Sequence, residues 1–149
     1  MMNYARATTL RAVKDLRLEQ LDFVPSGFKN SIGALLEHFA AIETLYQVRT
    51  FENRWMNDVE YERWGAGTDL GVRISELRGR DLSFYVAQLE EVRAKTLTEF
   101  AKRNDDWLLL EFPFKGETPA NHHWCWFHVF EDEISHRGQI RLIRQNLPR

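Results

Sequence analysis

The sequence is poor in cysteine and in long apolar runs, and both absences narrow what the protein can be. Its single cysteine, Cys125, excludes an intrachain disulfide framework. No apolar run approaches the roughly 18–20 residues that span a bilayer, and residues 1–6 lack the apolar core of a signal peptide. These absences predict a cytoplasmic protein without a membrane segment.

The sequence also lacks an excess of charge of one sign. It contains 20 basic residues and 22 acidic residues, so the formal net charge is −2, and the two signs are interspersed. Such a balance lacks the concentrated positive charge of a nucleic-acid-binding surface or of a polybasic membrane patch. We therefore expect neither a nucleic-acid partner nor a membrane partner.

What the chain does contain is enough apolar material for one core. Hydrophobic residues make up 44% of the 149 positions, and aromatic residues make up 13%. A chain of this length is long enough to bury a sizeable core and short enough to form one domain. The expected organisation is a single domain over residues 1–149.

Four segments have the apolar spacing of helices, and Ser31, Asp81 and Asn121 are suitable N-caps for the last three. A short helix near residues 58–63 lies within the long connection between the second and third helices. Residues 107–114 read as a brief extended segment without a partner strand. This pattern predicts an all-α fold, a four-helix bundle with a long connection between helices 2 and 3. The predicted helices are residues 3–14, 31–51, 82–102 and 121–146.

The residues with chemical potential are concentrated on the last predicted helix. At about 100° per residue, Asp132 lies within about 40° of His136, on a stripe that also contains Ile140 and should face the core. A buried carboxylate is costly unless it is paired or bound to a metal, and the i, i+4 spacing lets two side chains reach one ion. His38 on the second helix also points inward. It would be a third ligand, and three protein ligands leave coordination positions open, as in catalytic metal sites.

The position of His128 leaves two pairings open on this helix. His128 and His136 are eight residues apart, about 12 Å along the axis, so one ion could hold both only if both side chains stretched toward each other. The pair is therefore Asp132 with His136, or His128 with Asp132. His128 and Glu133 flank the stripe and could instead orient a ligand or hold a proton. Without a metal, His38 would be a hydrogen-bonded core residue and the neighbouring acids a solvated face.

Two short motifs resemble a known family. Residues 30–39, Asn-Ser-Ile-Gly-Ala-Leu-Leu-Glu-His-Phe, resemble the second-helix signature of the DinB/YfiT-like metalloenzymes, and residues 136–140, His-Arg-Gly-Gln-Ile, closely match their last-helix motif. The resemblance extends over nearly the whole chain and implies an up-down-down-up bundle. It also implies a divalent metal, zinc or nickel, held by His38 and by positions 132 and 136. The family usually has His at the earlier of these two positions, or Glu in a subgroup, whereas this chain has Asp132.

The resemblance further implies a metal-dependent enzyme with a small-molecule substrate, such as the low-molecular-weight thiols bacillithiol and mycothiol. The expected activity is thiol S-transfer, or a related isomerase or hydrolase reaction, in which the metal generates the nucleophile at neutral pH. Glu133 or Asp132 would take the proton. A homodimer is expected from the resemblance alone. The alternatives are a non-catalytic, stress-related helical bundle with a structural metal site, and a small-ligand binding protein whose metal site is degenerate at Asp132.

Overall fold

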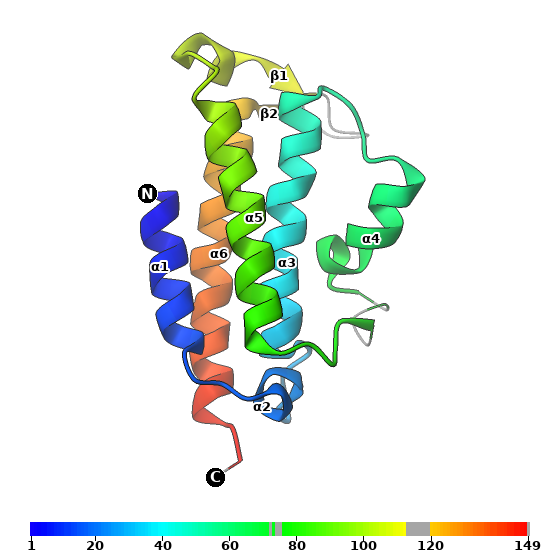
Figure 1. The fold of residues 1–149 in the computed structure, drawn as a ribbon, viewed down its shortest axis with the longest axis vertical. Coiled ribbons are helices and arrows are strands. Elements are labelled where there is room, and N and C mark those ends of the chain that lie inside the picture. The colour runs from blue at the N-terminus through cyan, green and yellow to red at the C-terminus, as the bar shows by residue number, and fades with distance from the viewer. Residues whose placement is uncertain (72, 74–75, 113–119, 149) are drawn as a thin grey trace.

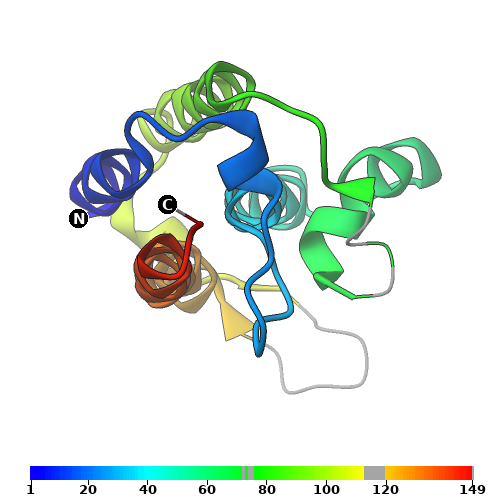
Figure 2. The ribbon, with the colours of Figure 1, turned by 90° about the horizontal axis from the view of Figure 1, so that it is seen from below.

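The body of the molecule, in this computed structural model, consists of four long helices: α1 (Met2–Val13), α3 (Ile32–Tyr46), α5 (Leu82–Phe100) and α6 (His122–Gln145). Figure 1 shows that α1 and α6 run in one direction and that α3 and α5 run in the opposite direction. Seen from below, the four helices surround a common interior (Figure 2). The predicted all-α fold is confirmed. The structure describes residues 1–71, 73, 76–112 and 120–148.

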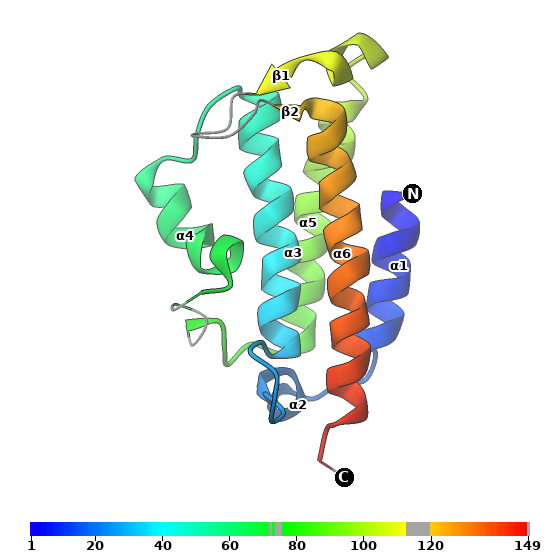
Figure 3. The same cartoon turned by 180° about the vertical axis from the view of Figure 1, so that it is seen from behind.

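Shorter elements connect the long helices. The helix α4 (Asp58–Asp69) lies outside the bundle and packs against α3, as Figures 1 and 3 show. The strands β1 (Glu111–Phe112) and β2 (Ala120–Asn121) form an antiparallel pair at the end of the bundle where α6 begins. The remaining elements are α2 (Leu18–Asp22), a π-helical segment (Gln47–Phe51) and a 3-10 turn (Asp105–Leu109).

The prediction for residues 107–114 was wrong in one respect. Instead of an extended run without a partner, the chain forms a 3-10 turn through residue 109, and residues 111–112 then pair with residues 120–121. The partner strand is only two residues long and directly precedes a helix. It therefore has none of the alternating pattern by which a strand is found. Residues 113 and 114 lie outside the described residues.

Side-chain caps explain where the helices begin, and all three predicted caps are confirmed. Ser31 Oγ accepts a hydrogen bond from the Ala34 amide at 3.1 Å, and the side chains of Asp81 and Asn121 accept equivalent bonds at 2.8 and 2.9 Å. The helix α4 begins with a reciprocal capping box between Asn57 and Glu60. With this start, α4 continues beyond the predicted residues 58–63.

The helix α3 is the centre of the bundle. Every residue from Ile32 to Glu43 is buried, because α4, α5 and α6 all pack against this helix. Its apolar residues form the main core cluster together with apolar residues of α5 and α6. A polar side chain in the middle of α3 is therefore enclosed by other elements, and His38 is such a side chain.

Candidate metal centre

Three side chains from two helices meet where α3 and α6 face each other. His38 comes from the middle of α3, and Asp132 and His136 come from successive turns of α6. His38 Nε2 lies 3.0 Å from Asp132 Oδ2, and His136 Nε2 lies 3.2 Å from Asp132 Oδ1. The two imidazole rings are nearly perpendicular, with centroids 4.9 Å apart. One donor atom from each residue lies within 4.8 Å of the other two, an arrangement suited to a single metal ion.

The backbone of α4 determines which nitrogen of His38 faces this cluster. His38 Nδ1 lies 2.7 Å from the carbonyl oxygen of Gly67. A carbonyl oxygen can only accept a hydrogen bond, so Nδ1 carries the proton and donates it. In the neutral ring, Nε2 then presents its lone pair to Asp132. Metal-bound histidines typically show this arrangement, in which the other ring N–H is held by a carbonyl or a carboxylate.

Gly67 permits this contact because it lets α4 approach α3 closely. A Cβ atom at position 67 would lie 2.7 Å from the Cβ of Ala41 and 3.3 Å from the carbonyl oxygen of Glu37. Only glycine fits at that separation without a shift of one helix. Our sequence reasoning missed Gly67. The available signal was a glycine inside a helical segment, which often marks a close packing contact.

The carboxylate of Asp132 is largely enclosed, and the described residues do not supply all the donors that it needs. Its side chain is 14% exposed, and Oδ2 lies 3.0 Å from His38 Nε2. Even so, Oδ2 receives no hydrogen bond of acceptable geometry from the described residues. When the His38 ring is neutral, with its proton on Nδ1, two lone pairs face each other across this distance. A cation between them would satisfy both groups, so the donor set fits a divalent metal, and imidazole ligands suit zinc or nickel.

Charge within the cluster favours the same interpretation. Burial acts to raise the pKa of Asp132, but the imidazoles of His136 and His38 outweigh it and hold that pKa below its usual range. The carboxylate of Asp132 in turn raises the pKa of His136, against the effect of burial. Asp132 is therefore ionised at neutral pH. A metal ion that binds His136 has to compete with a proton for the same nitrogen.

His128 lies outside this cluster. Its Nδ1 is 3.3 Å from Glu131 Oε2, and its ring stacks on Trp124 and meets the edge of Tyr46. Among the described residues, the group that could hold one ion consists of His38, Asp132 and His136. The structure thus brings together the first of the two predicted pairings and leaves His128 one turn away.

Glu133 points into a different environment from that of its neighbour Asp132. Its Oε1 accepts a hydrogen bond from Arg6 Nε at 3.0 Å, and its Oε2 accepts one from Arg6 Nη2 at 3.3 Å. Arg6 and Arg93 also bind Glu43, at 3.1 and 2.6 Å. These four side chains, each at most 9% exposed, form a buried charge network between α1, α3, α5 and α6. The contacts of Glu133 are those of a structural ion pair, and its predicted role in proton transfer stays untested.

The fold and the site together define a class of protein. It is a helical bundle with a candidate metal centre formed by two histidines and one carboxylate from facing helices. The chain belongs to the mycothiol S-transferase family, whose model matches residues 1–148. This is a DinB/YfiT-like family, so the resemblance seen in the two motifs is confirmed. A comparison with curated proteins gives no match. No helix in the described part of the chain is long and apolar enough to cross a membrane.

Proposed function

We propose that the protein is a metal-dependent thiol S-transferase that uses a low-molecular-weight thiol. The observation that carries the proposal is the convergence of His38, Asp132 and His136, whose donor atoms lie within 4.8 Å of one another. The family description, mycothiol S-transferase, supports the reaction class. Asp132 stands where the family usually has His. Its low pKa and missing donor make it a suitable anionic ligand.

The reaction requires a thiolate at neutral pH. The thiol sulfur forms a bond to an electrophilic atom, a leaving group departs with the bonding electrons, and the thiol proton is released to a base. A bound zinc or nickel ion would supply the acidity that generates the thiolate. His38, Asp132 and His136 would hold that ion, while the Gly67 carbonyl keeps His38 in the tautomer that can bind it. Three protein ligands leave room for the substrate sulfur.

Two residues are proposed to accept the thiol proton. Glu133 is the predicted acceptor, but Arg6 donates to both of its oxygens, so these oxygens are already engaged. His128 is the second candidate, because its side chain is 33% exposed and lies one turn before Asp132, with Glu131 beside it. Measuring thiol ionisation in Glu133→Gln and His128→Ala separates the two assignments.

A pocket between α3 and α4 would offer space for the substrate. It has a volume of about 310 Å³, and its lining includes Leu45 of α3 and the adjacent Thr68 and Asp69 of α4. Leu45 is seven residues after His38 and therefore lies on the same face of α3. Thr68 directly follows Gly67, the partner of His38. The volume falls at the lower end of the range for small-molecule pockets.

Metal content is the first test. The full chain is purified without an affinity tag, loaded with zinc or nickel, and analysed by mass spectrometry for bound metal. We expect about one ion per chain in the wild type and in the control His128→Ala, and a large loss in His38→Ala and His136→Ala. A wild type that retains no metal after loading would overturn the proposal, and retention by both variants would overturn the ligand assignment.

Activity is the second test. A panel of low-molecular-weight thiols is incubated with an electrophilic acceptor, and conjugate formation is followed with the metal-loaded and the metal-free protein. We expect conjugation with at least one thiol that disappears when the metal is removed. If the metal binds but no thiol reacts, the alternative of a non-catalytic bundle with a structural metal site is favoured instead.

A further inference from the structure

Positive charge is concentrated in the two end segments of the chain. Residues 1–14 and 134–149 contain seven of the 20 basic residues and none of the 22 acidic residues. The helices α1 and α6 pack side by side (Figures 1 and 3), so these two segments lie next to each other. Arg6 is buried in the charge network and does not contribute to the surface that they form. The net charge of −2 gives no sign of this local excess of positive charge. In these two segments the two signs of charge are not interspersed.

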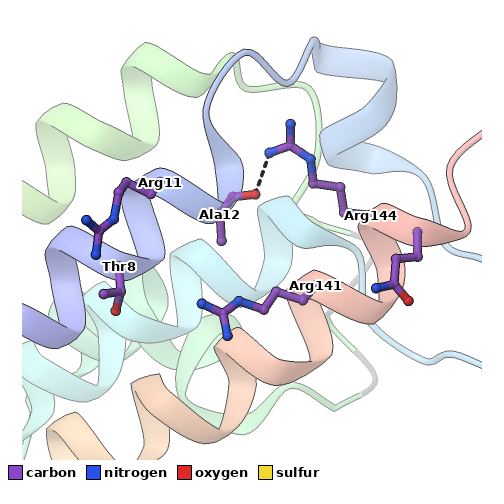
Figure 4. Close-up of a pocket in the computed structure, with 6 residues that line it drawn as sticks. Thr8, Arg11, Ala12, Arg141 and Arg144 are labelled. Carbon is purple, nitrogen blue, oxygen red and sulfur yellow. Dashed lines mark hydrogen bonds between the residues drawn. The ribbon is translucent and has the colours of Figure 1, made fainter.

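A pocket lies between α1 and α6 on this surface (Figure 4). It has a volume of about 480 Å³, within the range of small-molecule sites. Figure 4 shows Arg11 projecting from α1, and Arg141 and Arg144 projecting from α6 across the gap between the helices. We call this site the arginine pocket, and its lining consists of Thr8, Arg11, Ala12, Arg141, Arg144 and Gln145.

Two of the three guanidinium groups have no partner among the residues that the structure describes. Arg144 Nη1 donates to the carbonyl oxygen of Ala12 at 2.6 Å, so this residue stabilises the end of α1. Arg11 and Arg141 make no ion pair and no hydrogen bond with the described residues. Beside the pocket, Arg137 donates to Thr8 Oγ1, while its Nε is buried without a partner among the described residues. Stabilisation of the helix ends therefore explains Arg144 and gives Arg11, which lies in the last turn of α1, a partial role. It leaves Arg141 and the buried Nε of Arg137 unexplained.

We propose that the arginine pocket binds a small multivalent anion that carries phosphate groups. Guanidinium groups present planar pairs of donors that match phosphate oxygens, and an anion with several charges relieves the repulsion among three neighbouring cations. None of the described residues that line the pocket is aromatic, so they offer no ring on which a base could stack, and recognition rests on the phosphates themselves. The helix α6 contributes to this pocket and to the metal centre through different faces, since Arg141 is about 140° from His136 around the helix.

Calorimetric titration of the metal-loaded full chain with pyrophosphate tests this proposal, with inorganic phosphate as the weaker ligand. We expect one pyrophosphate per chain, with an affinity that falls as salt is added. Arg11→Gln and Arg141→Gln should each weaken binding about tenfold or more, because each removes charged hydrogen bonds to the ligand. The matched control Lys29→Gln removes one exposed basic residue outside the pocket and should change affinity less than about twofold.

Results of three kinds would overturn the proposal. The first is an absence of saturable pyrophosphate binding, or an equal loss of affinity in Lys29→Gln. The second is a loss of pyrophosphate binding in His38→Ala, which would place the ligand on the metal and not among the arginines. The third is binding to phosphatidylglycerol vesicles without binding of soluble pyrophosphate. Circular dichroism of each variant verifies the fold, and Arg141→Lys, which keeps the charge but loses the planar donor pair, should fall between the wild type and Arg141→Gln.

Discussion

Asp132 and Glu133 are neighbours on α6 and both lie in the bundle interior, yet their carboxylates differ in how they are satisfied. Both oxygens of Glu133 accept hydrogen bonds from Arg6. Asp132 faces two imidazoles, and its Oδ2 receives no hydrogen bond from the described residues. A buried carboxylate is costly unless it is paired. Glu133 therefore has its partner, Arg6, within the chain. Asp132 Oδ2 would need a partner from outside the chain, such as a metal ion.

Helix geometry explains how adjacent residues reach such different surroundings. Consecutive side chains on a helix point about 100° apart. Glu133 is thereby directed toward Arg6 on α1, and Asp132 toward His38 on α3. The polar interior therefore has two parts. The buried charge network holds the helices together. The candidate metal centre keeps ligand atoms that could bind an ion.

The largest expected effect is on stability, from breaking the buried charge network. Glu133→Gln leaves Arg6 and Arg93 with less compensation in a site that is nearly closed to solvent. Removing one partner of a buried ion pair costs about 3–5 kcal/mol. We expect the free energy of unfolding, measured by urea denaturation, to fall by that amount while metal content is retained. The exposed Glu131→Gln is the control, and a loss below about 1 kcal/mol for Glu133→Gln would contradict a structural role.

The substitution of the neighbouring residue should affect metal binding more than the stability of the fold. Asp132→Asn keeps the shape of the side chain but removes the anionic ligand, so we expect zinc affinity to fall by about 100-fold or more, beyond the effect of losing an outer partner. The free energy of unfolding of the metal-free protein should fall at neutral pH, because the imidazoles that lower the pKa of Asp132 stabilise its ionised form in the folded state. The fall should be smaller than in Glu133→Gln, since Asp132 is less buried. Zinc titration and urea denaturation of the same samples give both quantities. Unchanged zinc affinity in Asp132→Asn would remove this residue from the site.

A smaller effect on the same centre should come from outside it, at Gly67. In Gly67→Ala the new Cβ meets Ala41, so α4 must move away from α3 and weaken the hydrogen bond to His38. Loss of such an outer partner reduces metal affinity by about 10–100-fold. Gly138→Ala is the matched control, because a Cβ there meets nothing within 4 Å. It should leave zinc affinity unchanged and stabilise α6 by about 0.5–1 kcal/mol. Equal zinc affinities in the two variants would show that Gly67 has no part in the site.

The candidate ligands could be predicted from the sequence because they depend on local periodicity. Asp132 and His136 are separated by one turn, and His38 lies on the buried face of α3, so helix geometry alone directs all three inward. The helix starts could be predicted for the same reason, since a cap depends on residues only three positions apart.

Contacts between elements could not be predicted in this way. The bond from His38 to Gly67 requires α4 to dock on α3, and α4 lies in a connection with little apolar periodicity. The buried charge network joins side chains of four different helices. Its pairing therefore depends on how the helices are rotated in the bundle. The absence of acid from both ends of the chain was visible in the sequence, but its meaning depends on α1 lying beside α6.

The smallest expected effect concerns Cys125, the cysteine of the chain, and tests whether the protein has a sulfur nucleophile of its own. Cys125 lies on α6, seven residues before Asp132, and is fully buried. Burial raises the pKa of its thiol to about 11. Because the thiolate is the reactive form, iodoacetamide at neutral pH should label the native protein far more slowly than the urea-unfolded protein, with labelling followed by mass spectrometry. Rapid labelling of the native chain would make Cys125 a competing nucleophile, whereas slow labelling requires that the sulfur of the proposed reaction come from the substrate.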